Sequence, residues 1–157
     1  MIFTGTYEHA IDSKGRLAIP AGIRGQIQRG AGVVEGQSVQ LFVVPGDDGQ
    51  HLCVYTQDVF EKRAGELEQS SMAAEELLAY EEIFHASTRQ VELDTQGRVQ
   101  MPKDLLEQAG LGSEVVILGV KDHLKVRDRK AWELRKQALF QKNPGILMNP
   151  RLAAKKD

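Results

Sequence analysis

The chain contains nearly the same ten letters twice. IDSKGRLAIP occupies residues 11–20 and LDTQGRVQMP occupies residues 93–102, at a constant offset of 82 (94 − 12). Both copies keep the pattern Asp-x-x-Gly-Arg-x-x-x-Pro, and most of the other positions are conservatively replaced. Two copies are too few for a solenoid. The duplication therefore predicts two similar small modules that pair about a pseudo-two-fold axis.

The similarity continues downstream of the decamers. VQLFVV matches VVILGV at an offset of 76, and LCVYTQDVFEKR matches LKVRDRKAWELR at an offset of 72, so the first copy has longer loops. Alternating apolar residues, turn residues and a proline predict the same order in each copy. We expect a strand, a tight turn, a returning strand, a short helix beginning at the proline, two further strands and a longer helix.

Each decamer contains a predicted tight turn. Gly15 and Gly97 provide the positive φ angle that such a turn requires, and Asp12 and Asp94 can accept hydrogen bonds from the turn backbone. These four residues are therefore predicted to have structural roles in the two turns.

The repeated copies and the helices between and after them divide the chain into four predicted segments. Between the copies lies an acidic helical connector, and Ser70-Ser71 indicates a break between two helices within it. Thr56 and Asp128 are predicted to cap the helices that follow the two copies, with Phe60 and Trp132 as their apolar anchors. The end of the chain, residues 136–157, is predicted to be loosely held. The segments are a first module (6–58), a helical connector (59–86), a second module (87–130), and a C-terminal helix with a tail (131–157).

Composition favours a cytoplasmic globular protein. Apolar residues make up 41% of the chain and charged residues 27%, and there is one cysteine, Cys53, so no internal disulfide is expected. The apolar runs fall far below the roughly 20 residues of a membrane span, and the start of the chain does not resemble a secretion signal.

The net charge of −2 conceals an asymmetry. Residues 1–83 hold 6 Lys/Arg and 13 Asp/Glu, and residues 84–157 hold 14 Lys/Arg and 9 Asp/Glu. A generically nucleic-acid-binding chain is basic. Composition thus argues weakly against DNA binding, and the case for DNA depends on the local motif.

The arginine that both decamers share, Arg16 or Arg98, has two interpretations. A guanidinium held beside a stiff turn is suited to a phosphate or a guanine edge, and in copy one Lys14 and Arg24 add to Arg16. Alternatively, each arginine pairs with the aspartate of its own turn, Asp12 with Arg16 and Asp94 with Arg98, and only fixes the hairpin. Copy two has Gln96 where copy one has the lysine, which makes copy one the better candidate for a DNA contact.

The duplicated pattern and the opening FTGTYEHAIDSKGRLAIP resemble the MraZ family of bacterial transcriptional regulators, whose chains hold two AbrB-type modules. The similarity covers residues 3–135. It implies a mixed α+β fold, namely a pseudo-two-fold double-split β-barrel with swapped hairpins, built from two AbrB-like repeats with flanking helices.

The resemblance also implies a function. It implies a DNA-binding repressor of its own cell-division and cell-wall operon, which binds tandem promoter repeats as a homo-oligomeric ring. Arg16 is the expected DNA-contacting residue, with Arg98 as its counterpart. The expected partners are double-stranded DNA and further copies of the chain, in the cytoplasm at the nucleoid. No cofactor, metal, membrane or small-molecule substrate is expected.

Other classes of function fit the sequence less well. An enzyme could use Cys53 with His51 on one strand face, but no oxyanion device accompanies them, and copy two has Lys125 opposite Cys53. The four histidines lack the spacing of metal ligands. The acidic connector could bind a basic partner, although a solvated helix face is the commoner case. An AbrB-like antitoxin or transition-state regulator, and a structural ring that does not bind DNA, remain as alternatives.

Overall fold

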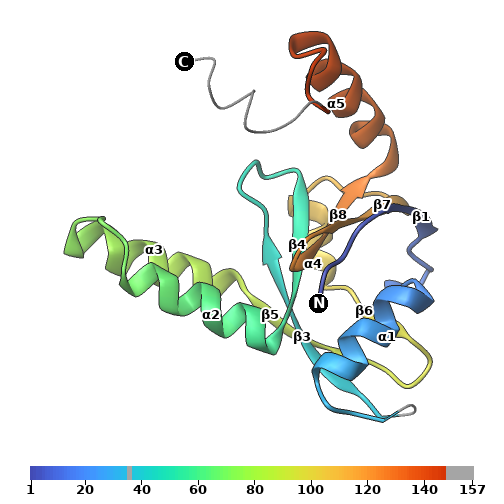
Figure 1. The fold of residues 1–157 in the computed structure, drawn as a ribbon, viewed down its shortest axis with the longest axis horizontal. Coiled ribbons are helices and arrows are strands. Elements are labelled where there is room, and N and C mark those ends of the chain that lie inside the picture. Colours follow the sequence, from blue (N-terminus) through green and yellow to red (C-terminus); the bar gives the residue numbers. More distant parts are fainter. Residues whose placement is uncertain (35–36, 148–157) are drawn as a thin grey trace.

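A computed structural model of the protein describes residues 1–34 and 37–147. In this part of the chain eight antiparallel strands form one sheet that curls into a nearly closed barrel, and five helices surround it (Figure 1). None of these helices has the length and apolar character needed to span a membrane. The strands are β1 (Thr6–Ala10), β2 (Arg16–Ala18), β3 (Val39–Pro45), β4 (His51–Thr56), β5 (Arg89–Leu93), β6 (Arg98–Gln100), β7 (Glu114–Val120) and β8 (His123–Asp128). The helices are α1 (Ala21–Gly30), α2 (Gln57–Glu68), α3 (Ala74–Ser87), α4 (Lys103–Gln108) and α5 (Arg129–Lys142).

The strand order shows that the two copies exchange their hairpins. The order is β1-β7-β8-β4-β3-β5-β6-β2, so β1 of copy one pairs with β7 of copy two, and β5 of copy two pairs with β3 of copy one. The outermost strands, β1 and β2, are joined by the first turn, where the Asp12 N–H donates to the Arg16 carbonyl over 3.0 Å. The predicted mixed α+β fold with a swapped-hairpin barrel is confirmed.

The register locates the pseudo-two-fold axis. Leu17 lies opposite Val99 in the β2–β6 pair, and these residues are equivalent in the two copies at the offset of 82. Cys53 lies opposite Lys125 in the β4–β8 pair, and these are equivalent at the offset of 72. The axis therefore passes through both pairs, which form opposite walls of the barrel.

The core is built from both copies because apolar residues alternate along the strands. Leu17 and Val99, on the axis, have no solvent exposure, and the residues beside them on β2 and β6 point outward. Helices α1 and α4 begin directly after Pro20 and Pro102, whose missing N–H groups suit the first turn of a helix. They close the two ends of the core with Ile23, Ile27 and Leu105, which are buried.

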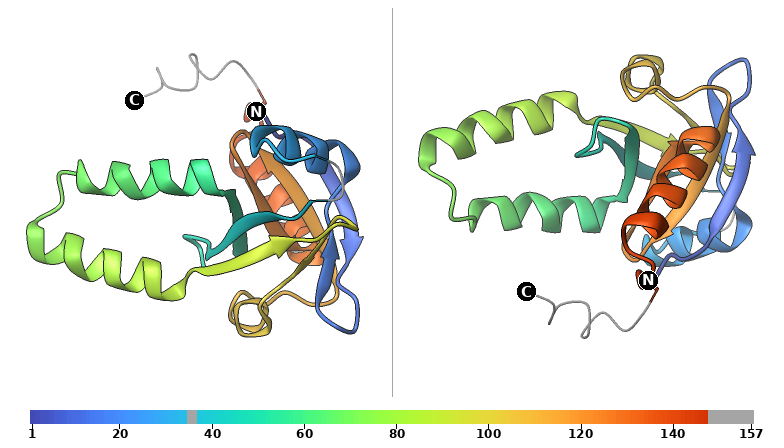
Figure 2. Two further views of the ribbon diagram at one scale, coloured as in Figure 1. Left: turned by 90° about the horizontal axis from the view of Figure 1, so that it is seen from below. Right: turned by 90° about the horizontal axis from the view of Figure 1, so that it is seen from above.

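Helices α2 and α3 form a hairpin that extends away from the barrel (Figure 2). Phe60 of α2 stacks on Phe42 of β3 with ring centroids 4.3 Å apart, and on Phe84 of α3 at 5.8 Å. The predicted break at Ser70-Ser71 is confirmed, since it lies between the two helices. The hairpin is thus attached to the barrel by a small aromatic cluster.

The helix caps were predicted correctly in copy two only. The Asp128 carboxylate accepts from the Ala131 N–H over 3.1 Å. Thr56 makes no such bond at the start of α2, and its hydroxyl is buried without a partner among the described residues. Trp132 is only partly buried, because among the described residues no helix covers α5 as α3 covers α2.

Two further expectations concern the segments. Part of the C-terminal region predicted to be loosely held is the ordered helix α5, while residues 148–157 lie outside the described residues. The division into modules stays a prediction. Strands from both module ranges form one continuous sheet, so the two modules share a single core.

The first prediction concerns the axis. Leu17→Ala removes a side chain with no solvent exposure from the centre of the β2–β6 pair, so the free energy of unfolding should fall by about 2–5 kcal/mol. Urea unfolding followed by circular dichroism measures this change. Leu147→Ala, at a position that is 85% exposed, is the matched control and should change stability by no more than about 0.5 kcal/mol. Equal losses in the two variants would contradict the proposed position of the core.

Candidate nucleic-acid interface

The outer face of the β2–β6 pair carries the two arginines that the sequence singled out. Arg16 lies opposite Gln100 and Ala18 lies opposite Arg98, while Leu17 between them points into the core. Arg16 and Arg98 are therefore diagonal neighbours on one face of a two-stranded ribbon, with backbones roughly 7–8 Å apart. Hairpin exchange has brought together two cations that are 82 residues apart in the chain (98 − 16).

The first turn binds the Arg16 guanidinium through one nitrogen only, its Nε. The Asp12 carboxylate accepts from the backbone N–H groups of Lys14 and Arg16, each over 2.9 Å, and from the Arg16 Nε over 2.8 Å. Hydrogen bonding from the Arg16 backbone, with its guanidinium adding to it, keeps the pKa of the Asp12 carboxyl below its usual value. The Arg16 side chain is 33% exposed, and among the described residues its two terminal Nη groups make no hydrogen bond. Gly15 has the predicted positive φ, +79°.

The second turn repeats the backbone geometry but not the ion pair. The Asp94 carboxylate accepts from the N–H groups of Gln96 and Arg98 over 2.8 and 3.0 Å, and Gly97 also has φ +79°. The Arg98 guanidinium donates to the Gln96 side chain instead of to Asp94. Within the described ranges the predicted Asp12–Arg16 pair is present, and the Asp94–Arg98 side-chain pair is absent.

Each turn is braced by the other copy. The Met101 N–H donates to the Gly15 carbonyl and the Ile19 N–H donates to the Gly97 carbonyl, both over 2.9 Å. Gln100 Nε2 donates to the Lys14 carbonyl over 2.6 Å. These hydrogen bonds fix the two turns relative to one another, and they thereby fix the backbone positions of Arg16 and Arg98.

Arg24 has a bracing role that the sequence did not reveal. Its Nη1 donates to the Gln96 carbonyl over 3.3 Å, and its guanidinium lies so close to Gly97 that a Cβ at that position would collide with it. Arg24 of copy one thus packs on the turn of copy two. The φ angle of +79° favours a glycine there, and the missing Cβ also leaves room for this close approach.

Lys103 is a candidate that the sequence analysis missed. An open groove of about 500 Å³ lies beside the first turn, and Lys14 and Lys103 are among its lining residues. Lys103 follows Pro102 in copy two, and it comes close to the turn of copy one only through the exchange of hairpins. Its position directly after the second decamer is the sequence feature that could have identified Lys103 as a candidate for this interface.

The opposite wall of the barrel carries a second polar cluster. His51 Nδ1 lies 2.6 Å from Asp48 Oδ1, and Arg127 Nη1 donates to Asp48 Oδ2 over 2.9 Å. Burial raises the pKa of the Asp48 carboxyl, but hydrogen bonds from Gln50, Arg127 and His51 outweigh burial and hold the pKa well below its usual range. Asp48, His51 and Arg127 thus stabilise the β3–β4 turn, and we call these three residues the structural lock.

This cluster does not support catalysis or metal binding. Burial raises the pKa of the Cys53 thiol, which makes a thiolate nucleophile unfavourable. Asp47, Asp48 and His51 could bring three ligand atoms together. However, the guanidiniums of Arg127 and Arg135 lie 2.9 and 3.8 Å from Asp48 and would repel a cation.

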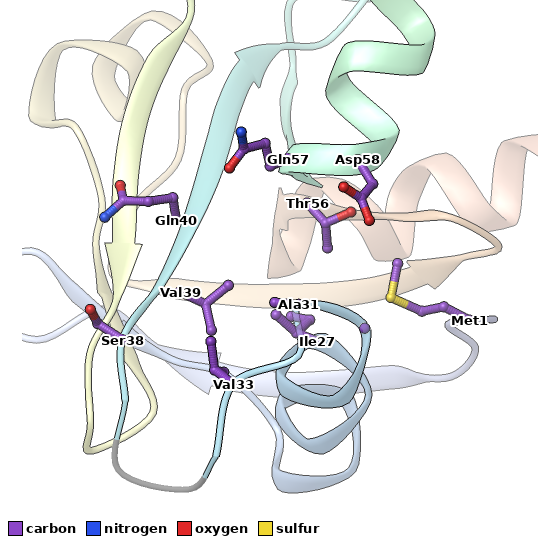
Figure 3. Close-up of a pocket in the computed structure, with 11 residues that line it drawn as sticks. Met1, Ile27, Ala31, Val33, Ser38, Val39, Gln40, Thr56, Gln57 and Asp58 are labelled. Carbon is purple, nitrogen blue, oxygen red and sulfur yellow. The ribbon is translucent and has the colours of Figure 1, made fainter.

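A cavity of about 370 Å³ lies between α1, β3 and the start of α2 (Figure 3). Ile27, Val33 and Val39 contribute apolar surface, and Thr56 and Asp58 come from the end of β4 and the start of α2. Asp58 is the one acidic side chain among its described lining residues. No pair of acid–base or nucleophilic side chains converges there within the described lining, so the cavity offers no reaction chemistry.

Comparison with known proteins identifies relatives in the MraZ family, which the duplicated decamer resembles. The family model described as "MraZ protein, putative antitoxin-like" matches residues 2–79 and 84–144. A protein of Salinispora tropica named transcriptional regulator MraZ is 33% identical over 132 residues, 84% of this chain and 85% of the relative. Proteins with the same name from Mycolicibacterium smegmatis and Thermomicrobium roseum are 33% identical over 137 residues (87% and 88% of the two chains) and 32% identical over 145 residues (92% and 94%).

The second prediction tests the structural lock. Asp48→Asn leaves Arg127, whose side chain is 5% exposed, without its anion, so the free energy of unfolding at pH 7 should fall by about 3 kcal/mol. Because the folded pKa of Asp48 is depressed, its contribution is complete above the unfolded value, about 4, and is lost as the pH falls below it. The difference between wild type and variant should therefore shrink in acid.

Urea unfolding of both proteins between pH 7 and pH 3 measures this difference. Asp47→Asn is the matched control, because the Asp47 side chain is 95% exposed, and it should leave stability nearly unchanged at every pH. A pH-independent difference between wild type and Asp48→Asn would contradict the ion pair.

Proposed function

The chain belongs to the MraZ family, and from that premise we propose that it is a transcriptional regulator that binds double-stranded promoter DNA through the outer face of the β2–β6 ribbon. The observation that carries the proposal is the presence of Arg16 and Arg98 on this one face, on turns braced by both copies. MraZ transcriptional regulators are not enzymes, and the prediction that this chain is not an enzyme is confirmed with the family.

The geometry of the ribbon suits a duplex. A two-stranded β-ribbon fits the major groove of B-DNA, where arginine can donate to guanine O6 and N7, and the same guanidinium can bind a phosphate instead. The pseudo-two-fold axis passes between β2 and β6, so the two arginines would face the DNA in related orientations. Arg16 has two Nη groups available to DNA, and Lys14 is exposed beside it. We therefore propose Arg16 as the principal contact, with Lys14 and Arg98 in support.

Arg24 contributes mainly by holding the second turn, because one of its Nη groups is bonded to the Gln96 carbonyl. Its remaining N–H groups stay available for a phosphate. In this proposal Arg24 fixes the position of Arg98 and adds positive charge to the same face.

The distribution of charge supports this orientation. Helix α2 follows β4, so the acidic α2–α3 hairpin leaves the barrel from the wall opposite the ribbon (Figure 2). Residues 57–87 hold eight Asp/Glu and two Lys/Arg. A chain with a net charge of −2 can therefore approach DNA with a basic face while its acidic hairpin points away.

We further propose that several chains assemble into a ring that binds tandem promoter repeats and represses the chain's own cell-division and cell-wall operon, at the nucleoid. A single ribbon offers few cations, so its affinity should be weak and dependent on salt. Contacts by several chains with several repeats would raise the affinity, by about 100-fold or more, through effective concentration. In the following test, a wild-type chain that assembles but does not bind this DNA would favour the alternative of a ring without DNA binding.

The third prediction is that Arg16→Ala weakens binding to the DNA upstream of the chain's own gene by at least about tenfold at physiological salt, because each chain loses one contact to phosphate or base. The fold and the assembly should persist, since Arg16 is outside the core. Fluorescence anisotropy over a range of salt concentrations measures the affinity, and native mass spectrometry measures the assembly.

Lys62→Ala is the matched control. It removes one positive charge from the exposed surface of α2, on the far side of the barrel, and should leave the affinity nearly unchanged. If Arg16→Ala bound DNA like wild type, the ribbon would not be the interface. If Arg16→Ala unfolded or its assembly dissociated, the arginine would have a purely structural role.

A further inference from the structure

Helix α3 is apolar on two opposite sides. Its inner side packs on α2 through Phe84, and Tyr80 stacks on Phe84 with ring centroids 5.9 Å apart. Its outer side carries Leu78 and Ile83, which are 67% and 69% exposed. The outer stripe, defined by the helical spacing i, i+3, i+4, i+7, i+8 and i+11, consists of Glu75, Leu78, Ala79, Glu82, Ile83 and Ala86. A solvated helix does not need this second apolar stripe.

Helix α5 lacks the covering that its counterpart has. At the offset of 72 it is equivalent to α2, which α3 covers. In the described part of the chain α5 lies against β7 and β8, contains no buried residue and has no helix stacked along it (Figure 1). Its outer stripe consists of Lys130, Ala131, Leu134, Arg135, Ala138 and Lys142, and every one of these residues is exposed.

The two stripes are complementary in charge and length. Helix α3 contains four glutamates and no lysine or arginine, and α5 contains five lysines and arginines and one glutamate. The stripes span 12 and 13 residues, and their end residues lie roughly 16–18 Å apart along the axis at the rise of an α-helix. Small alanines lie beside the exposed leucine or isoleucine on both, which permits close approach of two helices.

We infer that the outer stripe of α3 packs on the outer stripe of α5 from a second copy of this chain. The inference rests on the proposed ring, and it names the surfaces that would build it. Two different surfaces meet in this contact, so it is head-to-tail, and repetition of a head-to-tail contact closes into a ring when the rotation allows. Each chain then contributes α3 to one neighbour and α5 to the other.

Other occupants fit less well. A symmetric contact between the outer stripes of two α3 helices would place Glu75 and Glu82 of one copy against the same two glutamates of the other, and like charges across an interface repel. DNA is excluded from α3 by the same charge. Both α2–α3 and α5 follow strands of the β4–β8 wall, so a contact between them leaves the opposite β2–β6 ribbon exposed.

A mixing experiment with two variants tests the contact. The α3 variant is Leu78→Glu with Ile83→Glu, and the α5 variant is Lys130→Glu with Leu134→Glu; glutamate keeps the helix propensity high. Each variant alone retains one good surface and should remain a monomer of about 17.4 kDa. The equimolar mixture retains one complementary pair that cannot propagate, so native mass spectrometry should show a 1:1 dimer.

Controls separate this inference from the proposed function. Val34→Glu, at a position that is 67% exposed outside both stripes, should assemble like wild type, and circular dichroism should show all variants folded. Variants that keep the wild-type assembly, a mixture that stays monomeric, or a wild-type chain that is monomeric would each overturn the contact. If the wild type assembles and the mixture dimerises while the wild type fails to bind promoter DNA, the contact stands and the proposed DNA function falls.

Discussion

The pairing of β2 with β6 determines most of what this molecule can do. It places Leu17 against Val99 on the pseudo-two-fold axis, and both side chains are fully buried. The same pairing points Arg16 and Arg98 outward on one face and lets each copy brace the turn of the other. Without the exchange of hairpins, each copy would be an open half-barrel with unpaired strand edges. Fold and candidate interface thus depend on one short stretch of antiparallel sheet.

The first turn combines two roles that the sequence presented as alternatives. The Asp12–Arg16 ion pair is real, yet it occupies only the Nε of the guanidinium, so the arginine can fix its own hairpin and still offer two Nη groups. The second turn differs, since the Arg98 guanidinium bonds to Gln96 and its Nε is buried without a partner among the described residues. The two copies share a backbone while their side chains have diverged, which suits unequal contributions to binding.

Local chemistry made the turns and short helices predictable. Glycine at the end of each turn, aspartate at its start and proline before each helix act over a few residues, and the structure has them as expected. Contacts between the copies were not predictable in the same way. The brace from Arg24 to the second turn and the proximity of Lys103 to the first depend on a register 70 or more residues away in sequence. The empty cap at Thr56 was likewise not predictable from its own sequence, because threonine is a favoured capping residue.

The helices around the barrel do not follow the pseudo-two-fold symmetry of the core. The chain inserts α3 after copy one, and within the described residues nothing equivalent follows copy two, so α2 is covered and α5 is not. A chain with perfect two-fold symmetry would present the same surface twice, and pairing of identical surfaces favours closed dimers or open chains of them. One acidic surface and one basic surface instead favour the order α3 to α5 around a closed ring. The internal duplication thus builds the symmetric barrel. The different surfaces of α3 and α5 outside it would give the subunit two unlike sides, as a head-to-tail ring requires.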